Sequence, residues 1–166
     1  MMKKAAIIVL SSLSFMLPSA AQEPVPYAYR PSRQGEGYIP TLAAIMREIQ
    51  FCHIKLSYAG QQSNWELANY EVAQIENNLS NALQLYQNIP IVKIKLIDQP
   101  LVDLSQAVNA KDRVRFVRAF TDMTNACNSC HEAANVSFIS IQVPTSSPFS
   151  DQSFAPKKER SHPQLS

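Results

Sequence analysis

The sequence predicts an all-α protein with four helical segments between an irregular N-terminal lead-in and an extended C-terminal tail. Two observations carry this prediction. Apolar side chains recur three and four residues apart in long segments, which is typical of helices that bury one face. Prolines gather in the segments before and after the helical region. The length suits one domain.

The N-terminus is predicted to be a secretory signal peptide covering residues 1–21. Lys3 and Lys4 precede an apolar run from Ala5 to Leu17, and small residues follow up to Ala21, where we place the cleavage. The run is short for a membrane span, although an uncleaved anchor is the alternative, and we expect no transmembrane span in the mature chain. Without the two lysines, the 15 basic residues become 13, against 13 acidic ones. This neutral chain, which has no basic stripe, predicts no nucleic-acid partner.

A proline-rich lead-in is expected at residues 22–40, followed by the four-helix domain at residues 41–135. The first helix is predicted from Thr41 to Ala59, with Gly60 just past its end. One face of this helix is expected to be buried, and it comprises Leu42, Ile45, Met46, Ile49, His53 and Leu56.

The second helix is predicted to begin at the capping box Ser63–Glu66 and to run to about Gln87. Its apolar stripe comprises Trp65, Ala68, Val72, Ile75, Leu79, Ala82 and Tyr86. The next segment, Ile91 to Ile97, suits either a strand or the start of a helix. A short third helix is expected from Pro100 to about Val108.

Asp112 is expected to cap a fourth helix from Arg113 to about Ala133. Its predicted inner side comprises Val117, Phe120, Met123, Cys127 and Cys130. The tail occupies residues 136–166. Within it, residues 137–143 alternate partly, as an edge strand or extended segment does, and residues 157–166 are expected to be disordered.

The stretch from Cys127 to His131 has the form CxxCH, which is the attachment motif of c-type haem. The two thiols add to the two vinyl groups of the porphyrin, and the following histidine reaches the iron. The motif therefore predicts one covalent haem c, held by thioethers from Cys127 and Cys130, with His131 as the proximal iron ligand. In bacteria this haem is attached outside the cytoplasm, so motif and export signal together predict a periplasmic protein.

Other interpretations of the two cysteines are less consistent with the rest of the chain. A thioredoxin-like redox pair is typical of a βαβ unit, which the helical pattern does not provide. A structural zinc site needs four ligands, and only Cys52, His53 and His162 remain to complete one. A plain disulfide in a structural or interaction module stays as the third alternative.

Over roughly residues 41–135 the chain resembles the class II cytochromes c, the cytochrome c prime type. The features it shares are the order of helices and a CxxCH motif near the end of the last one. The resemblance implies an antiparallel four-helix bundle that carries one covalent haem. The lead-in, the short third helix and the C-terminal extension are departures, which indicate a divergent member. The class I fold is disfavoured because no methionine follows His131.

The distal side of the iron is expected to face the first helix, as the resemblance implies. That helix offers His53, our preferred distal ligand, and Met46 as the alternative; an open or apolar site is the third possibility. Two strong axial ligands favour one-electron transfer, whereas an open site favours binding of nitric oxide or carbon monoxide. We therefore expect an electron carrier rather than an enzyme, with a gas-binding protein as the alternative.

Redox proteins are the expected partners. The arginines at positions 113, 115 and 118 are most simply a solvated helix face, and a docking patch for an acidic partner is the alternative. Cys52 is expected to be buried as a small apolar residue. Its alternative is a homodimer contact through the first helix, a surface that class II relatives often use.

Overall fold

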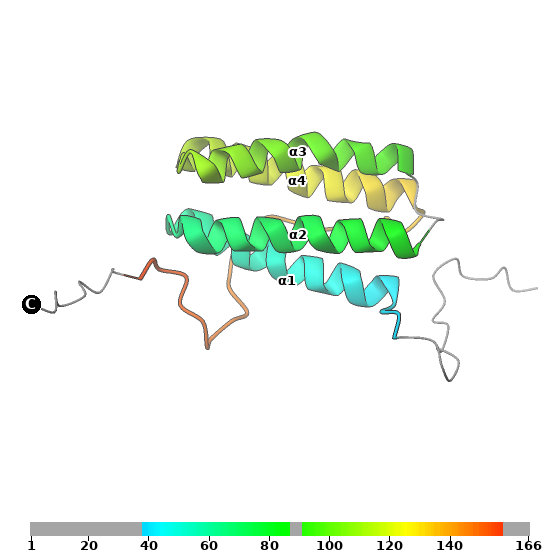
Figure 1. The fold of residues 1–166 in the computed structure, drawn as a ribbon, viewed down its shortest axis with the longest axis horizontal. Helices are drawn as coiled ribbons and strands as arrows, with labels where there is room; N and C mark the ends of the chain where they lie inside the picture. The colour runs from blue at the N-terminus through cyan, green and yellow to red at the C-terminus, as the bar shows by residue number, and fades with distance from the viewer. Residues whose placement is uncertain (1–37, 87–90, 158–166) are drawn as a thin grey trace, which may run out of the picture.

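The chain folds into an antiparallel four-helix bundle, as the computed structural model shows for residues 38–86 and 91–157, with the backbone alone described at 91–95. The helices are α1 (Leu42–Gln61), α2 (Trp65–Leu85), α3 (Ile91–Asn109) and α4 (Arg113–Ala133). They alternate in direction, so the start of α1 and the end of α4 lie at the same end of the bundle (Figure 1). The all-α fold class is confirmed. The predicted signal peptide, most of the lead-in and His162 lie outside the described residues.

Polar side chains just before three of the helices explain where those helices begin. Thr41 accepts a hydrogen bond from the backbone N–H of Ala44 at 3.1 Å, and Asp112 caps α4 as predicted. The predicted capping box at Ser63 is wrong. Ser63 has a φ of 59°, and Asn64 caps α2 instead by accepting from the N–H of Leu67.

Gly60 does not end α1, because the helix continues to Gln61. Its missing side chain serves packing instead. A Cβ at this position would lie 2.1 Å from two ring carbons of Phe116 on α4, far inside van der Waals contact. The glycine therefore lets α1 and α4 approach each other closely at the end of the bundle where α1 ends and α4 begins.

The third helix begins at Ile91, well before the predicted start, and Pro100 lies inside it. An internal proline removes one backbone hydrogen bond and clashes with the preceding turn. Burial offsets this cost, because four apolar residues of α3 recur at helical spacing on the core side, namely Ile97, Leu101, Leu104 and Val108. The ambiguous segment 91–97 is thus helical.

The core between the four helices is mainly apolar, and the predicted faces of α1 and α2 contribute to it. On α4 the observed buried face is rotated slightly about the helix axis relative to the predicted one. Phe116 is 1% exposed, whereas Val117, which we expected inside, is 50% exposed. The buried residues of α4 are Phe116, Ala119, Phe120, Met123, Thr124 and Ala126, and Cys127 and Cys130 pack against them.

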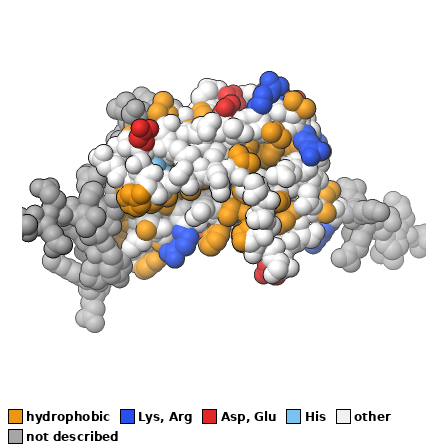
Figure 2. Space-filling view, turned by 180° about the vertical axis from the view of Figure 1, so that it is seen from behind, with side chains coloured by type: hydrophobic (Ala, Val, Ile, Leu, Met, Phe, Trp, Pro, Cys, Tyr) orange, Lys and Arg blue, Asp and Glu red, His pale blue; other side chains and the backbone are white. Residues whose placement is uncertain are grey.

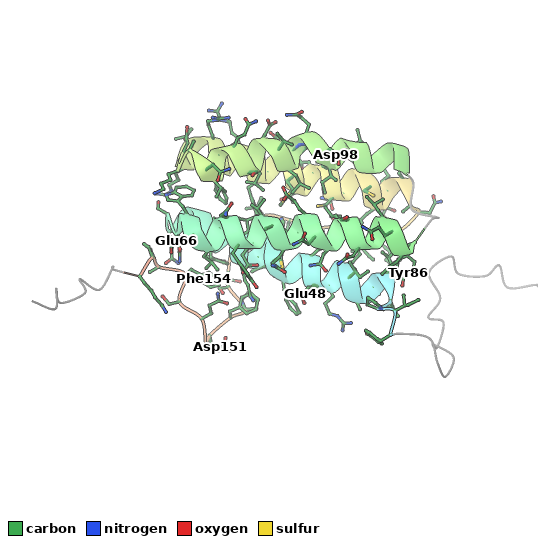
Figure 3. The ribbon with its side chains drawn as sticks, viewed as in Figure 1. Glu48, Glu66, Tyr86, Asp98, Asp151 and Phe154 are labelled. Atoms are coloured by element: carbon green, nitrogen blue, oxygen red, sulfur yellow. The ribbon has the colours of Figure 1, made fainter. Side chains whose placement is uncertain are left out.

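The tail returns along the bundle from the end of α4 toward the end of α1 (Figure 1). Within the described part of the tail, residues 137–143 form turns and irregular backbone rather than a strand. Figure 2 shows the rear face of the bundle, where hydrophobic side chains are prominent and charged ones are few. Phe149 lies against Phe51 of α1. The nearly buried Phe154, labelled in Figure 3, belongs to the tail, and its ring centroid lies 5.4 Å from that of Tyr58.

Candidate haem-binding site

The last turns of α4 carry the two motif cysteines on the side that packs against the core. Cys127 and Cys130 are half-buried and free, and the three-residue spacing sets them one helical turn apart. His131, which follows directly, is also half-buried. The motif thus presents two thiols and one imidazole at a single end of one helix.

Both motif thiols lie in surroundings that disfavour the thiolate. Burial raises the pKa of Cys127 to about 11, with a contribution from Cys130, and burial also raises the pKa of Cys130. Reactive redox cysteines have lowered pKa values and lie near positive charge. The site therefore does not have the electrostatics of a thioredoxin-like pair, and it offers neutral thiols beside apolar groups.

The imidazole of His131 has one nitrogen engaged by the backbone of the tail. Nδ1 lies 2.9 Å from the carbonyl oxygen of Ile139. A carbonyl oxygen only accepts, so Nδ1 carries the proton and donates it. Nε2 of the neutral ring then keeps its lone pair. This is the tautomer that a histidine needs in order to bind a metal through Nε2.

Asn128, the first variable residue of the motif, also binds the tail. Its side-chain N–H donates to the carbonyl of Ile141 at 2.8 Å, and its Oδ1 accepts from the N–H of Ile141 at 2.7 Å. The amide therefore satisfies both backbone groups of one residue. These bonds hold the tail against α4 beside His131.

His53 lies deep in the core, 3% exposed, where α1 faces α4. Its Nε2 is 2.8 Å from Oγ1 of Thr124, whose own proton goes to the carbonyl of Phe120. The Thr124 oxygen therefore accepts from Nε2–H. Burial lowers the pKa of His53 to about 4, so the ring is neutral near pH 7. Binding iron through Nε2 requires this hydrogen bond to break.

The contact between His53 and Thr124 fixes which residues of α1 and α4 lie level with each other. Met46 is seven residues before His53, and His131 is seven residues after Thr124. Because the helices are antiparallel, both steps lead about 10 Å toward the same end of the bundle. Seven residues also return to nearly the same helix face, within about 20°. The half-buried Met46 therefore comes level with His131, and His53 does not.

Three groups at this site were not predicted from the sequence, namely Thr124, Asn128 and the carbonyl of Ile139. Thr124 has a detectable pattern, because it lies one turn after Phe120 on the buried face. The other two have none. Asn128 occupies a variable position of the motif, and a backbone carbonyl carries no mark in the sequence.

Cys52 is buried, as predicted, and lies apart from the motif beside Glu71 of α2. Burial, together with Glu71, raises the pKa of the Cys52 thiol to about 12. Burial likewise raises the pKa of Glu71. The three predicted arginines of α4 are exposed, which agrees with a solvated face.

The comparisons with known proteins add no family to these observations. Protein-family models, curated proteins and solved structures all give no match to the chain. In the described ranges, no three His, Cys, Asp or Glu side chains gather in a way that could hold a metal ion by themselves. No helix among the described residues is both long and apolar enough to span a membrane.

Proposed function

We propose that this chain is an exported, periplasmic c-type cytochrome with one haem, which transfers single electrons between redox partners. One arrangement carries the proposal. Two free thiols and a histidine lie together on the last turns of α4, and the histidine donates from Nδ1 and so keeps Nε2 available. A covalent haem needs this set of groups.

Each motif residue has a distinct part in holding the group. Cys127 and Cys130 would each add S–H across one vinyl group, which forms a thioether and releases nothing. His131 would bind the iron through Nε2. The haem, once bound, supplies an iron that takes up and gives back one electron. The four-helix fold and the motif at the end of α4 also agree with the resemblance to class II cytochromes c.

Met46 is the distal ligand that we now favour over His53. It comes level with His131, whereas Nε2 of His53 is already bonded to Thr124 about two turns away. Met46 and His131 would together hold the iron through a thioether and an imidazole, and such a pair would supply a higher reduction potential than two histidines would. This ligand pair suits an electron carrier.

Redox partners would approach near the exposed residues that follow the motif. Phe138 is 82% exposed and Ile139 46% exposed, and the Ile139 backbone contacts His131. Electron-transfer encounters are weak and small, so a short apolar patch near the haem is enough for them.

A gas-binding protein of the cytochrome c prime kind is the second candidate. The observation in its favour is the bond between His53 and Thr124, which competes with iron binding by one of the two distal ligands proposed from the sequence. If Met46 also stays away from the iron, the distal position is open to nitric oxide or carbon monoxide.

Two experiments test these functions. The protein is expressed in bacteria competent in cytochrome maturation and is analysed on a haem-stained denaturing gel. Wild type and Cys52→Ala should give a stained band, whereas Cys127→Ala with Cys130→Ala should not. Equal staining of all three, or of none, contradicts the proposal. The reduced spectrum then separates the two candidates, because a high-spin iron that binds carbon monoxide at once favours the gas-binding protein.

A further inference from the structure

The segment after α4 contacts the proposed iron ligand, although the CxxCH motif does not require such a segment. The carbonyl of Ile139 accepts from Nδ1 of His131 at 2.9 Å. The backbone turns back directly after the helix, where Asn135 has a φ of 58° and the N–H of Val136 donates to the carbonyl of His131. The chain therefore reverses over the histidine that it has just supplied.

Asn128 holds the reversed segment at Ile141, two residues after the carbonyl that contacts His131. Its amide forms two short hydrogen bonds with the backbone of Ile141, at 2.7 and 2.8 Å, in the way that a neighbouring strand would. Both bonds are partly buried, which shields them from competing water. Since Asn128 and His131 lie one turn apart on α4, holding Ile141 also determines where the carbonyl of Ile139 lies.

The far end of the same segment is attached near the opposite end of the bundle, where α1 ends and α2 begins. Nδ2 of Asn64 lies 3.2 Å from the carbonyl oxygen of Phe154, to which it donates, and Phe154 is 5% exposed. The ring of Phe149 lies under the ammonium group of Lys55 at 5.3 Å. The segment is thus tied at both ends, and residues 139–141 do not depend on one hydrogen bond alone.

We propose that residues 139–141 form a support for the proximal ligand, and that Asn128 is the positioning residue that holds it in place. This inference rests on the proposed function, because it assigns a role to His131 as an iron ligand. An acceptor on Nδ1 fixes the tautomer, orients the ring and makes Nε2 a stronger donor to iron. A stronger donor stabilises the oxidised iron, so the support lowers the reduction potential.

The test uses the full-length haem protein and two readouts that do not depend on activity. One is the reduction potential from an optical redox titration, and the other is the exchange rate of the His131 Nδ1 proton in nuclear magnetic resonance spectra. Asn128→Ala removes both bonds to Ile141 and favours the helix that it lies in. Ser129→Ala is the matched control, because among the described residues that hydroxyl bonds only to the helix backbone at Asn125.

Asn128→Ala is expected to raise the reduction potential and to make the Nδ1 proton exchange about five- to thirtyfold faster, as for the loss of one or two net hydrogen bonds. Ser129→Ala should match wild type in both readouts. Unchanged potential and exchange in Asn128→Ala would overturn the support while leaving the haem protein intact. Wild-type protein without haem would instead overturn the proposed function and this inference together.

Discussion

Replacing Gly60 with alanine tests the register between α1 and α4, on which the pairing of Met46 with His131 depends. The new methyl group would lie 2.1 Å from two ring carbons of Phe116, whereas carbon atoms pack at about 3.5 to 4.0 Å. The Phe116 ring must therefore retreat by well over 1 Å. It is 1% exposed and lies between the rings of Trp65 at 6.1 Å and Phe120 at 5.7 Å. Moving the ring therefore requires these neighbouring side chains to shift as well.

Two opposing effects set the size of the change. Overpacking a core costs about 1–3 kcal/mol and sometimes more. Alanine gains about 1 kcal/mol over glycine inside a helix. Because the clash is severe and the ring is enclosed, we expect a net loss of about 2 kcal/mol in the free energy of unfolding.

Urea unfolding followed by circular dichroism measures this change. Ala73→Gly, at an exposed position of α2, calibrates the intrinsic difference between the two residues in this bundle. Phe116→Leu in the Gly60→Ala background should recover part of the loss, so the two effects should be non-additive. If Gly60→Ala raises the stability by about 1 kcal/mol, as at an open helix position, α1 does not meet α4 there and the register is wrong.

Three further predictions concern the core. Met46→Leu should convert a low-spin reduced iron to a high-spin iron that binds carbon monoxide. His53→Leu should leave the optical spectrum unchanged. If His53→Leu instead gives the high-spin iron and Met46→Leu changes nothing, His53 is the distal ligand. The pKa of His53 is lowered to about 4 in the folded chain from an ordinary 6.5. As the pH falls, the unfolded chain therefore takes up this proton before the folded chain does, and the contribution of neutral His53 to the free energy of unfolding is fully present only above pH 6.5. Up to about 3 kcal/mol should be lost as the pH falls from 6.5 to 4, and urea titrations of His53→Leu should lack this dependence. Tyr58→Phe removes a buried hydroxyl that has no hydrogen-bond partner among the described residues, and its unfolding midpoint should be equal or higher, not lower.

The helices were predictable from the sequence because their signals are local. Apolar spacing identified the buried faces of α1 and α2, and Asp112 marked the start of α4, where the structure has it. The start of α3 was missed because Pro100 indicates a boundary locally. The tertiary burial of Leu101 and Leu104 outweighs that preference, and no local pattern reveals it.

Of the candidate site, only the residues of the CxxCH motif were predictable from the sequence. Cys127, Cys130 and His131 form a motif with fixed spacing, so adjacency in the chain is enough to find them. Whether Met46 lies at the same height along the bundle as His131 depends on the axial register between α1 and α4. Sequence spacing within α1 alone does not contain that information. The bond from His131 to the carbonyl of Ile139 depends on a chain reversal, and any residue type supplies a backbone carbonyl.

The intact mass of the exported protein is the most direct measurement of the central claim. Protein purified from cells that can mature c-type cytochromes, and then denatured to remove anything bound without a covalent link, should have the mass of the processed polypeptide plus one haem. Replacing Cys127 and Cys130 with alanine should remove that added mass, while Cys52→Ala should keep it. A denatured wild-type protein with the mass of polypeptide alone would contradict the account.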